Sequence, residues 1–461
     1  MKTSFNIESE VGVKRYVQVV LILLLCFWLG ARAYFGPSSI HTLAFSSAVV
    51  LVGSAFFVRF VIDLLLRPEP LSRPVVGREK LSIEEAHSRA QEAAIASSSQ
   101  NLITWGGLPL ALEEAVGHFF ILGTSGSGKT LTFNSLMAEI LPLCHQPKFR
   151  AIIYDVKTEI LPFLHCLGLE LGRDYVSINP FDERGIAWDV AKDITSPIDT
   201  ENMARILIPE NPKEREPHFT NVARQFVHGV LEIVTRERPG NWDLADVLHV
   251  LRNQDRIKEV LSQSAAGEDL IRQHFGPRSG RNSVIATLDQ NVARYQTLAS
   301  LWSAASQKIS LKDWAAGTSP EGGPLDLPPI LILSRVKKYR VQLSAINRAM
   351  LQYLCNELIS PLQPKTQEPR TFLFLDELRE AGYIEDLPTF LNDGREYGVS
   401  VVMGTQSMEG LRKIYQQDEA QEITANCWNM GFYRQNSKDS AKWAQDTIGF
   451  QLLYEESYDQ G

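Results

Sequence analysis

Two long apolar stretches stand near the start of the chain. Residues 16–34 are apolar apart from Gln18 and Arg32, and residues 42–58 include no charged side chain. Either stretch can cross the roughly 30 Å hydrocarbon layer as a helix, which takes about 17 to 25 residues. The segment between them, 35–40, is short and contains glycine, proline and serine. The pattern therefore predicts a transmembrane hairpin of two helices.

Basic residues flank this hairpin on both sides. Lys14 and Arg15 precede it, and Arg59, Arg67 and Arg73 follow it. Because the positive-inside rule assigns such flanks to the cytoplasmic side, we expect both ends of the hairpin in the cytoplasm.

Short apolar segments alternate with helical periodicity after residue 101. The apolar segments predict strands at 118–122, 151–154 and 175–178, separated by helices at 129–140 and 159–167. Strands and helices in alternation are typical of a parallel sheet with crossover helices. We therefore expect an α/β domain with a mostly parallel sheet.

The periodicity becomes helical between residues 196 and 315. Phe226, Val230 and Val234, for example, recur on one helical face. Strand patterns then resume at 330–333, 371–375 and 399–404. The sequence thus predicts an all-α domain inserted into the α/β domain.

The first predicted strand runs into a glycine-rich loop that matches the pattern G-x-x-x-x-G-K-[ST]. In this pattern backbone N–H groups surround a phosphate, and the next helix adds its positive N-terminal end. Lys129 then reaches the β- and γ-phosphates, and the Thr130 hydroxyl binds Mg²⁺. A glycine-rich turn that binds nothing is the alternative. The residues of the loop are Gly123, Thr124, Ser125, Gly126, Ser127, Gly128, Lys129 and Thr130.

The predicted strand 371–375 ends in two carboxylates. Asp376 would join the ligands of Mg²⁺, and Glu377 could polarise the attacking water. The strand 399–404 leads to Gln406, whose amide could reach the γ-phosphate or that water. The alternatives are a solvated acid for Glu377 and a polar strand end for Gln406. We expect ATP as the nucleotide, since no Asn-Lys-x-Asp guanine motif follows.

Arg395 lies between these two strands, away from its own phosphate loop. From there it could act in trans on the nucleotide of a neighbouring subunit, as an arginine finger that contributes about 10³ to 10⁵ in rate. The alternative is a surface arginine paired with Glu396. Arg434 is a weaker candidate for the same role.

These patterns divide the chain into successive parts. They are a transmembrane hairpin at 1–70, a linker with a short helix at 71–100, the first part of a nucleotide-binding domain at 101–195, the all-α insertion at 196–315, and the second part of the nucleotide-binding domain at 316–461.

Composition narrows the class of protein. A chain of 461 residues is too long for one ordinary core. The formal net charge of −8 argues against a surface coated with nucleic acid, but it allows a local basic channel. Within such a channel the segment 337–340 could meet a single strand, although a solvated turn is the commoner role of such a segment.

The five cysteines form no C-x-x-C pair, which fits a reducing compartment. Adjacent cysteine and histidine residues at 144–145 and 165–166 leave a zinc site as an alternative to packing roles. A cleaved signal peptide is the alternative to the first membrane helix, because the triplet at 31–33 imitates a cleavage site. Cleavage would send the nucleotide loop to a compartment without ATP, which favours the hairpin.

Taken in order, these elements resemble the type IV secretion and conjugation coupling proteins of the TraD type. The resemblance covers nearly the whole chain, including the hairpin, the helical insertion and residues 311–314. It rests on the stretches 123–130, 154–159, 179–182 with 187–189, 374–378, and 394–398 leading to 404–407.

The resemblance implies a hexameric ATPase with a RecA-like P-loop core. It implies a multi-pass protein of the bacterial inner membrane, with its N-terminus and ATPase domain in the cytoplasm. The all-α domain would recognise or gate the substrate, and the central channel would face single-stranded DNA carrying a relaxase. Components of the type IV secretion channel would be partners, with ATP and Mg²⁺ as cofactors.

Two departures from the family pattern stand out. Thr158 occupies a position where relatives often have glycine. The chain ends at Gly461, soon after 447–450, where relatives continue with further strands and a tail. We therefore expect the C-terminal strands of the sheet to be missing.

Two other functions fit parts of the sequence. A double-stranded DNA pump of the FtsK/HerA kind is also a membrane-tethered hexamer, although the helical insertion argues against it. A docking receptor, in which nucleotide binding orders a platform without hydrolysis, draws support from the early end of the chain. Strand preference and steady-state ATP turnover distinguish these functions.

Overall fold

The computed structural model describes residues 73–77, 80–97, 101–210, 217–275, 281–317 and 326–454. The predicted hairpin at 16–34 and 42–58 lies outside the described residues. Among those that are described, no helix combines the length and the apolar character needed to cross a membrane. The chain forms two compact units, of which the larger is 80–449. In the smaller unit, β1 (Arg73–Gly77) pairs antiparallel with β13 (Gln451–Tyr454).

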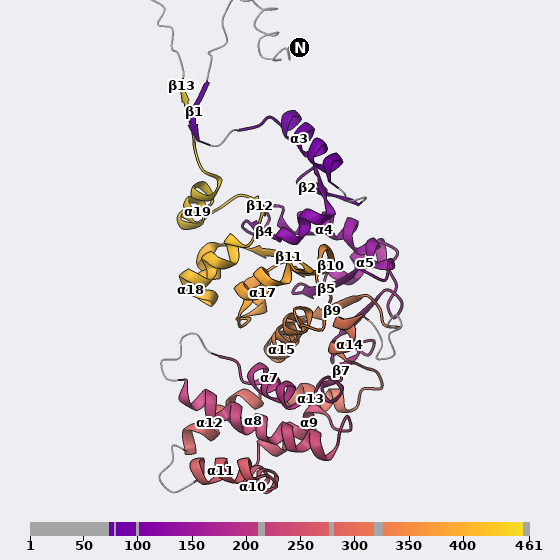
Figure 1. Cartoon of the computed structure of the whole chain (residues 1–461), viewed down its shortest axis with the longest axis vertical. Helices are drawn as coiled ribbons and strands as arrows, with labels where there is room; N and C mark the ends of the chain where they lie inside the picture. Colours follow the sequence, from indigo (N-terminus) through magenta and orange to yellow (C-terminus); the bar gives the residue numbers. More distant parts are fainter. Residues whose placement is uncertain are drawn as a thin grey trace, which may run out of the picture. The chain divides into compact units, whose positions relative to one another are not determined.

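A parallel sheet of seven strands forms the centre of the larger unit (Figure 1). Each strand predicted from the apolar pattern belongs to this sheet, so the prediction of a parallel α/β core is confirmed. In sheet order, the strands are β12 (Asn429–Phe432), β4 (Phe119–Leu122), β11 (Tyr397–Thr405), β10 (Thr366–Leu375), β5 (Arg150–Asp155), β9 (Ile330–Ser334) and β6 (Tyr175–Ile178).

The inner strands are largely apolar on both sides, as is usual for a parallel sheet that helices cover on both faces. Along β4, Phe119 packs into the core on one face and Phe120 into the core on the other, and both are fully buried. One face is covered by α4 (Lys129–Ile140) and α5 (Ile160–Cys166). The opposite face is covered by α15 (Arg340–Leu358), α17 (Leu387–Gly394) and α18 (Met408–Ala425).

The elements described between residues 197 and 303 are all helices, as the sequence predicts. They gather at the α15 side of the sheet, below it in Figure 1. The predicted stripe of Phe226, Val230 and Val234 is buried along one of them. The helices are α7 (Pro197–Leu207), α8 (His218–Glu237), α9 (Leu244–Leu251), α10 (Gln254–Leu261), α11 (Ala265–His274), α12 (Arg281–Val292) and α13 (Gln296–Ser303).

A buried carboxyl group joins the two places where the chain passes between the sheet and these helices. Asp193 accepts hydrogen bonds from Trp188 Nε1 at 2.6 Å and from Ser310 Oγ at 2.5 Å. The backbone N–H groups of Leu311 and Lys312 also donate to it, at 3.0 and 3.3 Å. Burial raises the pKa of Asp193 to about 7, although all these donors favour the ionised form. The stretches 187–189 and 311–314 thus have a structural role at this junction.

Smaller elements complete the described chain. The helix predicted around 83–95 is present as α3, whereas β12 is a strand that the sequence analysis did not predict. The remaining helices and strands are α3 (Ile83–Ala96), β2 (Leu102–Trp105), β3 (Leu108–Ala111), β7 (Ala187–Trp188), α6 (Val190–Asp193), β8 (Lys308–Ile309), α14 (Leu311–Ala316), α16 (Leu378–Ala381) and α19 (Lys438–Ile448).

Candidate nucleotide and metal site

A cavity of about 430 Å³ opens at the carboxyl ends of the central strands. Ligands of open α/β sheets bind at this edge. Most of the predicted site residues meet there, although they come from distant parts of the sequence. The lining consists of Thr124, Ser125, Gly126, Gly128, Lys129, Thr130, Leu131, Val156, Lys157, Asp376, Glu377, Glu380 and Gln406.

The phosphate loop joins β4 to α4, as its sequence predicts. Gly126 and Gly128 have φ angles of +73° and +106°, a backbone region that favours glycine. A Cβ atom at Gly123 would lie 2.5 Å from Ser127 Oγ and 2.6 Å from Tyr433 Cβ, so this turn also requires glycine. Because α4 begins at Lys129, its free N-terminal amides lie beside the cavity.

The segment after β12 supports this loop from the side. The backbone N–H of Thr124 donates to the carbonyl of Arg434 at 3.1 Å, and Gln435 Nε2 donates to the carbonyl of Leu122 at 3.0 Å. The Tyr433 hydroxyl also hydrogen-bonds the hydroxyl of Thr132. Sequence reasoning missed these supports, because the short strand before them has no clear apolar pattern. Arg434 contacts the loop through its backbone, and its side chain is exposed.

The two carboxylates, Asp376 and Glu377, follow β10 as expected, and both lie close to Lys129. Glu377 is buried, and burial raises the pKa of its carboxyl group. The charge of Lys129 and hydrogen bonds from Gln406 act in the opposite direction and favour the ionised form. Burial also lowers the pKa of Lys129, while Glu377 and Asp376 counteract that shift. The structure therefore places Lys129, Asp376, Glu377 and Gln406 in one electrostatically coupled group.

The structure adds Lys157 to this group. Its Nζ donates hydrogen bonds of 2.7 Å to Thr130 Oγ1 and of 2.7 Å to Asp376 Oδ2. These are the two residues that the sequence assigns to Mg²⁺. The sequence alone predicts no role for Lys157, because residues 154–159 stand out only through the family resemblance.

The residues present fit both Mg²⁺ and a phosphate. Asp376 Oδ1 and Ser127 Oγ are buried, and neither has a hydrogen-bond partner among the described residues. A carboxylate and a hydroxyl are oxygen ligands of the kind that Mg²⁺ takes together with substrate phosphates. The loop amides and Lys129 supply the donors that a phosphate requires.

Arg395 does not lie in this cavity. It follows α17 and precedes β11, so it stands at the amino edge of the parallel sheet, whereas the cavity is at the carboxyl edge. The side chain donates to Asn392 Oδ1 at 3.1 Å and to Asn426 Oδ1 at 2.7 Å, and it lies over the ring of Trp428. The alternative of a pair with Glu396 is wrong, because Glu396 pairs with Lys365. A role in trans stays a prediction.

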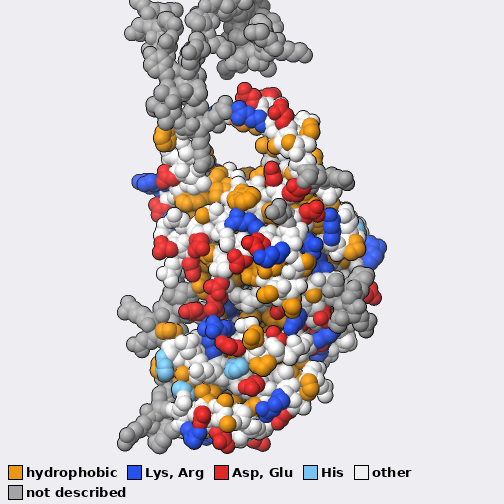
Figure 2. All heavy atoms as spheres, in the orientation of Figure 1, with side chains coloured by type: hydrophobic (Ala, Val, Ile, Leu, Met, Phe, Trp, Pro, Cys, Tyr) orange, Lys and Arg blue, Asp and Glu red, His pale blue; other side chains and the backbone are white. Residues whose placement is uncertain are grey.

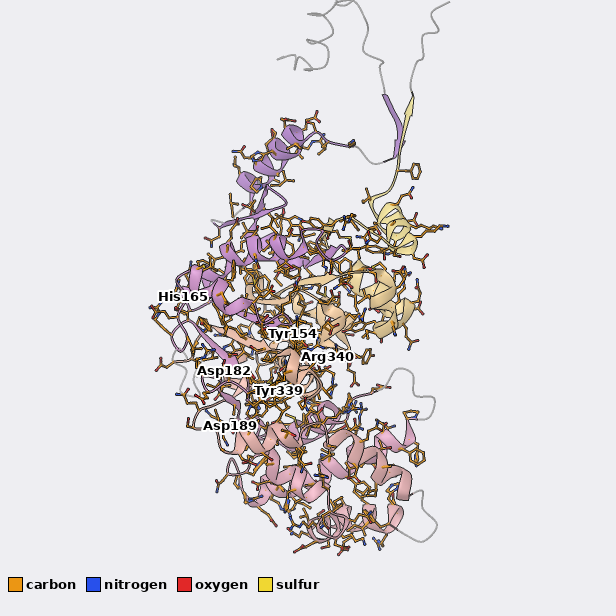
Figure 3. All side chains as sticks on the ribbon, turned by 180° about the vertical axis from the view of Figure 1, so that it is seen from behind. Tyr154, His165, Asp182, Asp189, Tyr339 and Arg340 are labelled. Carbon is orange, nitrogen blue, oxygen red and sulfur yellow. The ribbon has the colours of Figure 1, made fainter. Side chains whose placement is uncertain are left out.

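The aromatic ring of the candidate DNA-binding segment 337–340 packs against another aromatic ring of the same chain. Tyr339 stacks on Phe181 with ring centroids 3.8 Å apart and an interplanar angle of 10°. Figure 3 shows Tyr339 beside the loop that carries Asp182. Since this face of the Tyr339 ring is covered, we do not assign it to base stacking.

Three comparisons place the chain among known proteins. Residues 102–460 match the family described as the type IV secretion-system coupling protein DNA-binding domain. Coupling protein TraD of Escherichia coli (strain K12) is 23% identical over 345 residues, which are 75% of this chain and 45% of TraD. The chain therefore spans about half the length of the curated relative that it matches.

Solved structures of the plasmid coupling protein TrwB are similar in fold. The complex of TrwB with the non-hydrolysable ATP analogue ADPNP has a TM-score of 0.66 and 18% identity, over 84% of this chain and 88% of that one. An unbound form has a TM-score of 0.67 and 19% identity, over 86% and 85%. TrwB has also been solved with ADP and Mg²⁺. At these identities the likeness shows a RecA-like P-loop fold. From the family match, which covers most of its length, this chain belongs to the type IV secretion-system coupling proteins.

Proposed function

We propose that this chain is a coupling ATPase. In this proposal it hydrolyses ATP to drive relaxase-bound single-stranded DNA into a type IV secretion channel at the bacterial inner membrane. The observation that carries the enzymatic part is the meeting of Lys129, Thr130, Asp376, Glu377 and Gln406 around one cavity. Family membership supports the part that concerns transfer.

The loop and its helix would bind the nucleotide. The loop amides surround the phosphates, and Lys129 reaches the β- and γ-phosphate oxygens. Thr130 and Asp376 would hold Mg²⁺, which neutralises charge on the phosphates when it is bound. The complexes of TrwB with ADPNP and with ADP and Mg²⁺ support ATP and Mg²⁺ as the cofactors of this chain.

Glu377 would orient and polarise the attacking water. Its buried position raises its pKa towards neutrality, which improves a carboxylate as a general base near pH 7. Gln406 holds that carboxylate by hydrogen bonds and presents a polar group to the same cavity. A residue that only filled a strand end would need neither burial nor these contacts.

A neighbouring subunit would complete the site. Arg395 lies at the opposite edge of the sheet from its own cavity, so it could serve the nucleotide only of another copy. We propose a homo-oligomeric ring of six subunits, in which Arg395 of one subunit serves the nucleotide of the next. The helices α7–α13 would then gate or recognise the substrate.

The charge on the face drawn in Figure 2 argues against a DNA coat on that face. On the face drawn in Figure 2, basic and acidic side chains are interspersed, and no broad basic band crosses it. A DNA-coated surface would need such a band, because affinity for DNA depends on phosphate neutralisation. We propose that single-stranded DNA passes within the ring and that the membrane hairpin anchors the ring to the inner membrane.

Steady-state ATP turnover by the full chain tests this function. We expect turnover to rise with single-stranded DNA more than with double-stranded DNA, and Lys129→Ala to abolish it. Lys148→Ala is a control, since Lys148 pairs with Glu368 at 3.3 Å and does not line the cavity. Stronger stimulation by double-stranded DNA would favour a pump of the FtsK/HerA kind. Nucleotide binding without any turnover would favour a docking receptor.

A further inference from the structure

We propose that the ammonium group of Lys157 takes the position of Mg²⁺ between Thr130 and Asp376 until the nucleotide enters with its metal. Lys157 is then a competitor of Mg²⁺ and determines how much Mg²⁺ the site requires. This inference rests on the proposed function of the same cavity.

The contacts of Lys157 exclude simultaneous binding of the metal. Its Nζ lies 2.7 Å from Thr130 Oγ1 and 2.7 Å from Asp376 Oδ2. Mg²⁺ must approach its oxygen ligands to about 2.0–2.1 Å in octahedral geometry. An ammonium group that bridges Thr130 Oγ1 and Asp376 Oδ2 occupies the space between them, so an ion that took both oxygens as ligands would have to displace it. The lysine and the metal are therefore alternative occupants of one position.

The carboxylates around the cavity stabilise the ammonium group of Lys157. Asp376 and Glu377 lie close enough to Lys129 to counteract the lowering of its pKa, and the charge of Lys157 adds to that lowering. Two carboxylates and two ammonium groups thus balance in the chain alone. An incoming nucleotide adds phosphate charges and Mg²⁺ adds two positive charges, so Lys157 can leave Asp376 and stay near the phosphates.

The turn after β5 aims Lys157 at the cavity. The Asp155 carboxylate accepts the N–H groups of Glu159 at 3.4 Å and Ile160 at 3.5 Å, which closes the turn. Within it, Thr158 has a φ angle of +59°, an unfavourable value for a β-branched residue. Backbone strain of this kind persists where the surrounding structure imposes it, often at a ligand site.

The two lysines of the cavity differ in their freedom to move. The side chain of Lys157 is 45% exposed, whereas Lys129 is buried. Lys157 can therefore swing outward on its flexible stem without disturbing the core, while Lys129 stays fixed beside the loop. A competing cation needs this freedom, because it must leave when the metal arrives.

The test titrates Mg²⁺ while the full chain binds a fluorescent analogue of ADPNP. In Lys157→Met, the half-saturating Mg²⁺ concentration should fall by about 2- to 5-fold, the range of a half-exposed ion pair that no longer competes. In EDTA, by contrast, the same variant should bind the analogue more weakly, because the phosphates lose a nearby cation. A purely structural role would weaken binding under both conditions. Lys157→Gln, a second neutral variant, should give the same two shifts.

Lys148→Met is the matched control. Lys148 is 47% exposed and also pairs with a carboxylate, but it lies at the other edge of the sheet. Lys148→Met should leave unchanged both the half-saturating Mg²⁺ concentration and the affinity for the analogue in EDTA. An unchanged or higher Mg²⁺ requirement in both Lys157 variants, with normal binding by the unaltered chain, overturns this inference and leaves the proposed function standing. Failure of the unaltered chain to bind the analogue overturns both.

Discussion

Gln406 favours the ionised carboxylate of Glu377 through both its side chain and its backbone. The two residues stand at the tips of the neighbouring strands β10 and β11, so the contact ties the two strand ends together. It also fixes the orientation of the carboxylate that we assign to the attacking water. A polar residue at the end of one strand thus counteracts part of the rise in pKa that burial causes in an acid at the end of the next.

Replacing Gln406 should change the pH dependence of turnover. The hydrogen bonds from Gln406 favour the ionised carboxylate, so Gln406→Ala should raise the pKa of Glu377 further. The base must be ionised to act, and the acid limb of kcat should therefore move to higher pH. A pH–rate profile of ATP turnover measures this shift. If the limb stays where it is in the unaltered chain, Glu377 is not the titrating base.

Arg395→Ala should reduce turnover by about 10³- to 10⁵-fold while nucleotide affinity stays near that of the unaltered chain. Arg205→Ala is the control, since Arg205 is an exposed arginine that pairs with Glu201 at 3.3 Å among the insertion helices. Mixing Arg395→Ala with Lys129→Ala subunits should restore part of the turnover, because some sites then combine an intact loop with an intact finger. Mixtures no more active than the separate variants would argue against a finger in trans.

Thr158→Gly should stabilise the fold by about 1 kcal/mol. Its φ angle of +59° is costly for threonine and costs glycine little. Thr158→Ala separates strain from bonding, because it removes the hydrogen bond from Thr158 Oγ1 to the Lys157 carbonyl but keeps the Cβ atom. Only the glycine variant should gain stability in urea unfolding. A loss of stability in Thr158→Gly would show that the residue is not strained.

His118 should make the fold less stable in acid. Its ring is buried, accepts the N–H of Val401 at 3.1 Å and donates to the carbonyl of Leu391, so it is neutral. Burial lowers the pKa of His118 from 6.5 to about 4. Between these two pH values His118 binds a proton in the unfolded chain but not in the folded chain. The contribution of His118 to the free energy of unfolding is therefore fully present above pH 6.5 and is lost as the pH decreases towards 4.

The size of this effect follows from the shift. Acidification from about pH 7.5 to about pH 5 should cost about 2 kcal/mol through His118 alone. His118→Gln keeps a donor and an acceptor but does not titrate, so its urea unfolding should lack this part of the pH dependence. Equal pH dependence in both proteins would contradict a neutral, buried His118.

The sequence predicted the central sheet because each inner strand is apolar on both faces. It also predicted the nucleotide loop and the carboxylates, since these follow strands directly and parallel strands end at one edge. The support from Tyr433 and Gln435 was not predictable in this way. They follow a half-buried edge strand, and their contacts with the loop depend on the order of strands in space.

Two side chains show why other parts of the site escaped prediction. The direction of Lys157 depends on the turn that Asp155 closes and on the unusual backbone of Thr158, and neither has a clear signal in one sequence. For Arg395 the sequence suggested a finger in trans and left a pair with its neighbour Glu396 as the alternative. In the structure, Asn426 and Trp428 provide the contacts from a distant part of the chain. The predicted membrane hairpin and the expectation of missing C-terminal strands stay predictions.

The rate of ATP hydrolysis by Glu377→Gln at saturating ATP shows whether this cavity is the hydrolytic site. The substitution keeps the shape of the side chain and removes the base, so hydrolysis should fall by about 10²- to 10⁴-fold while ATP binds with unchanged affinity. Hydrolysis within a few-fold of the rate of the unaltered chain would contradict the assignment of this cavity as the hydrolytic site.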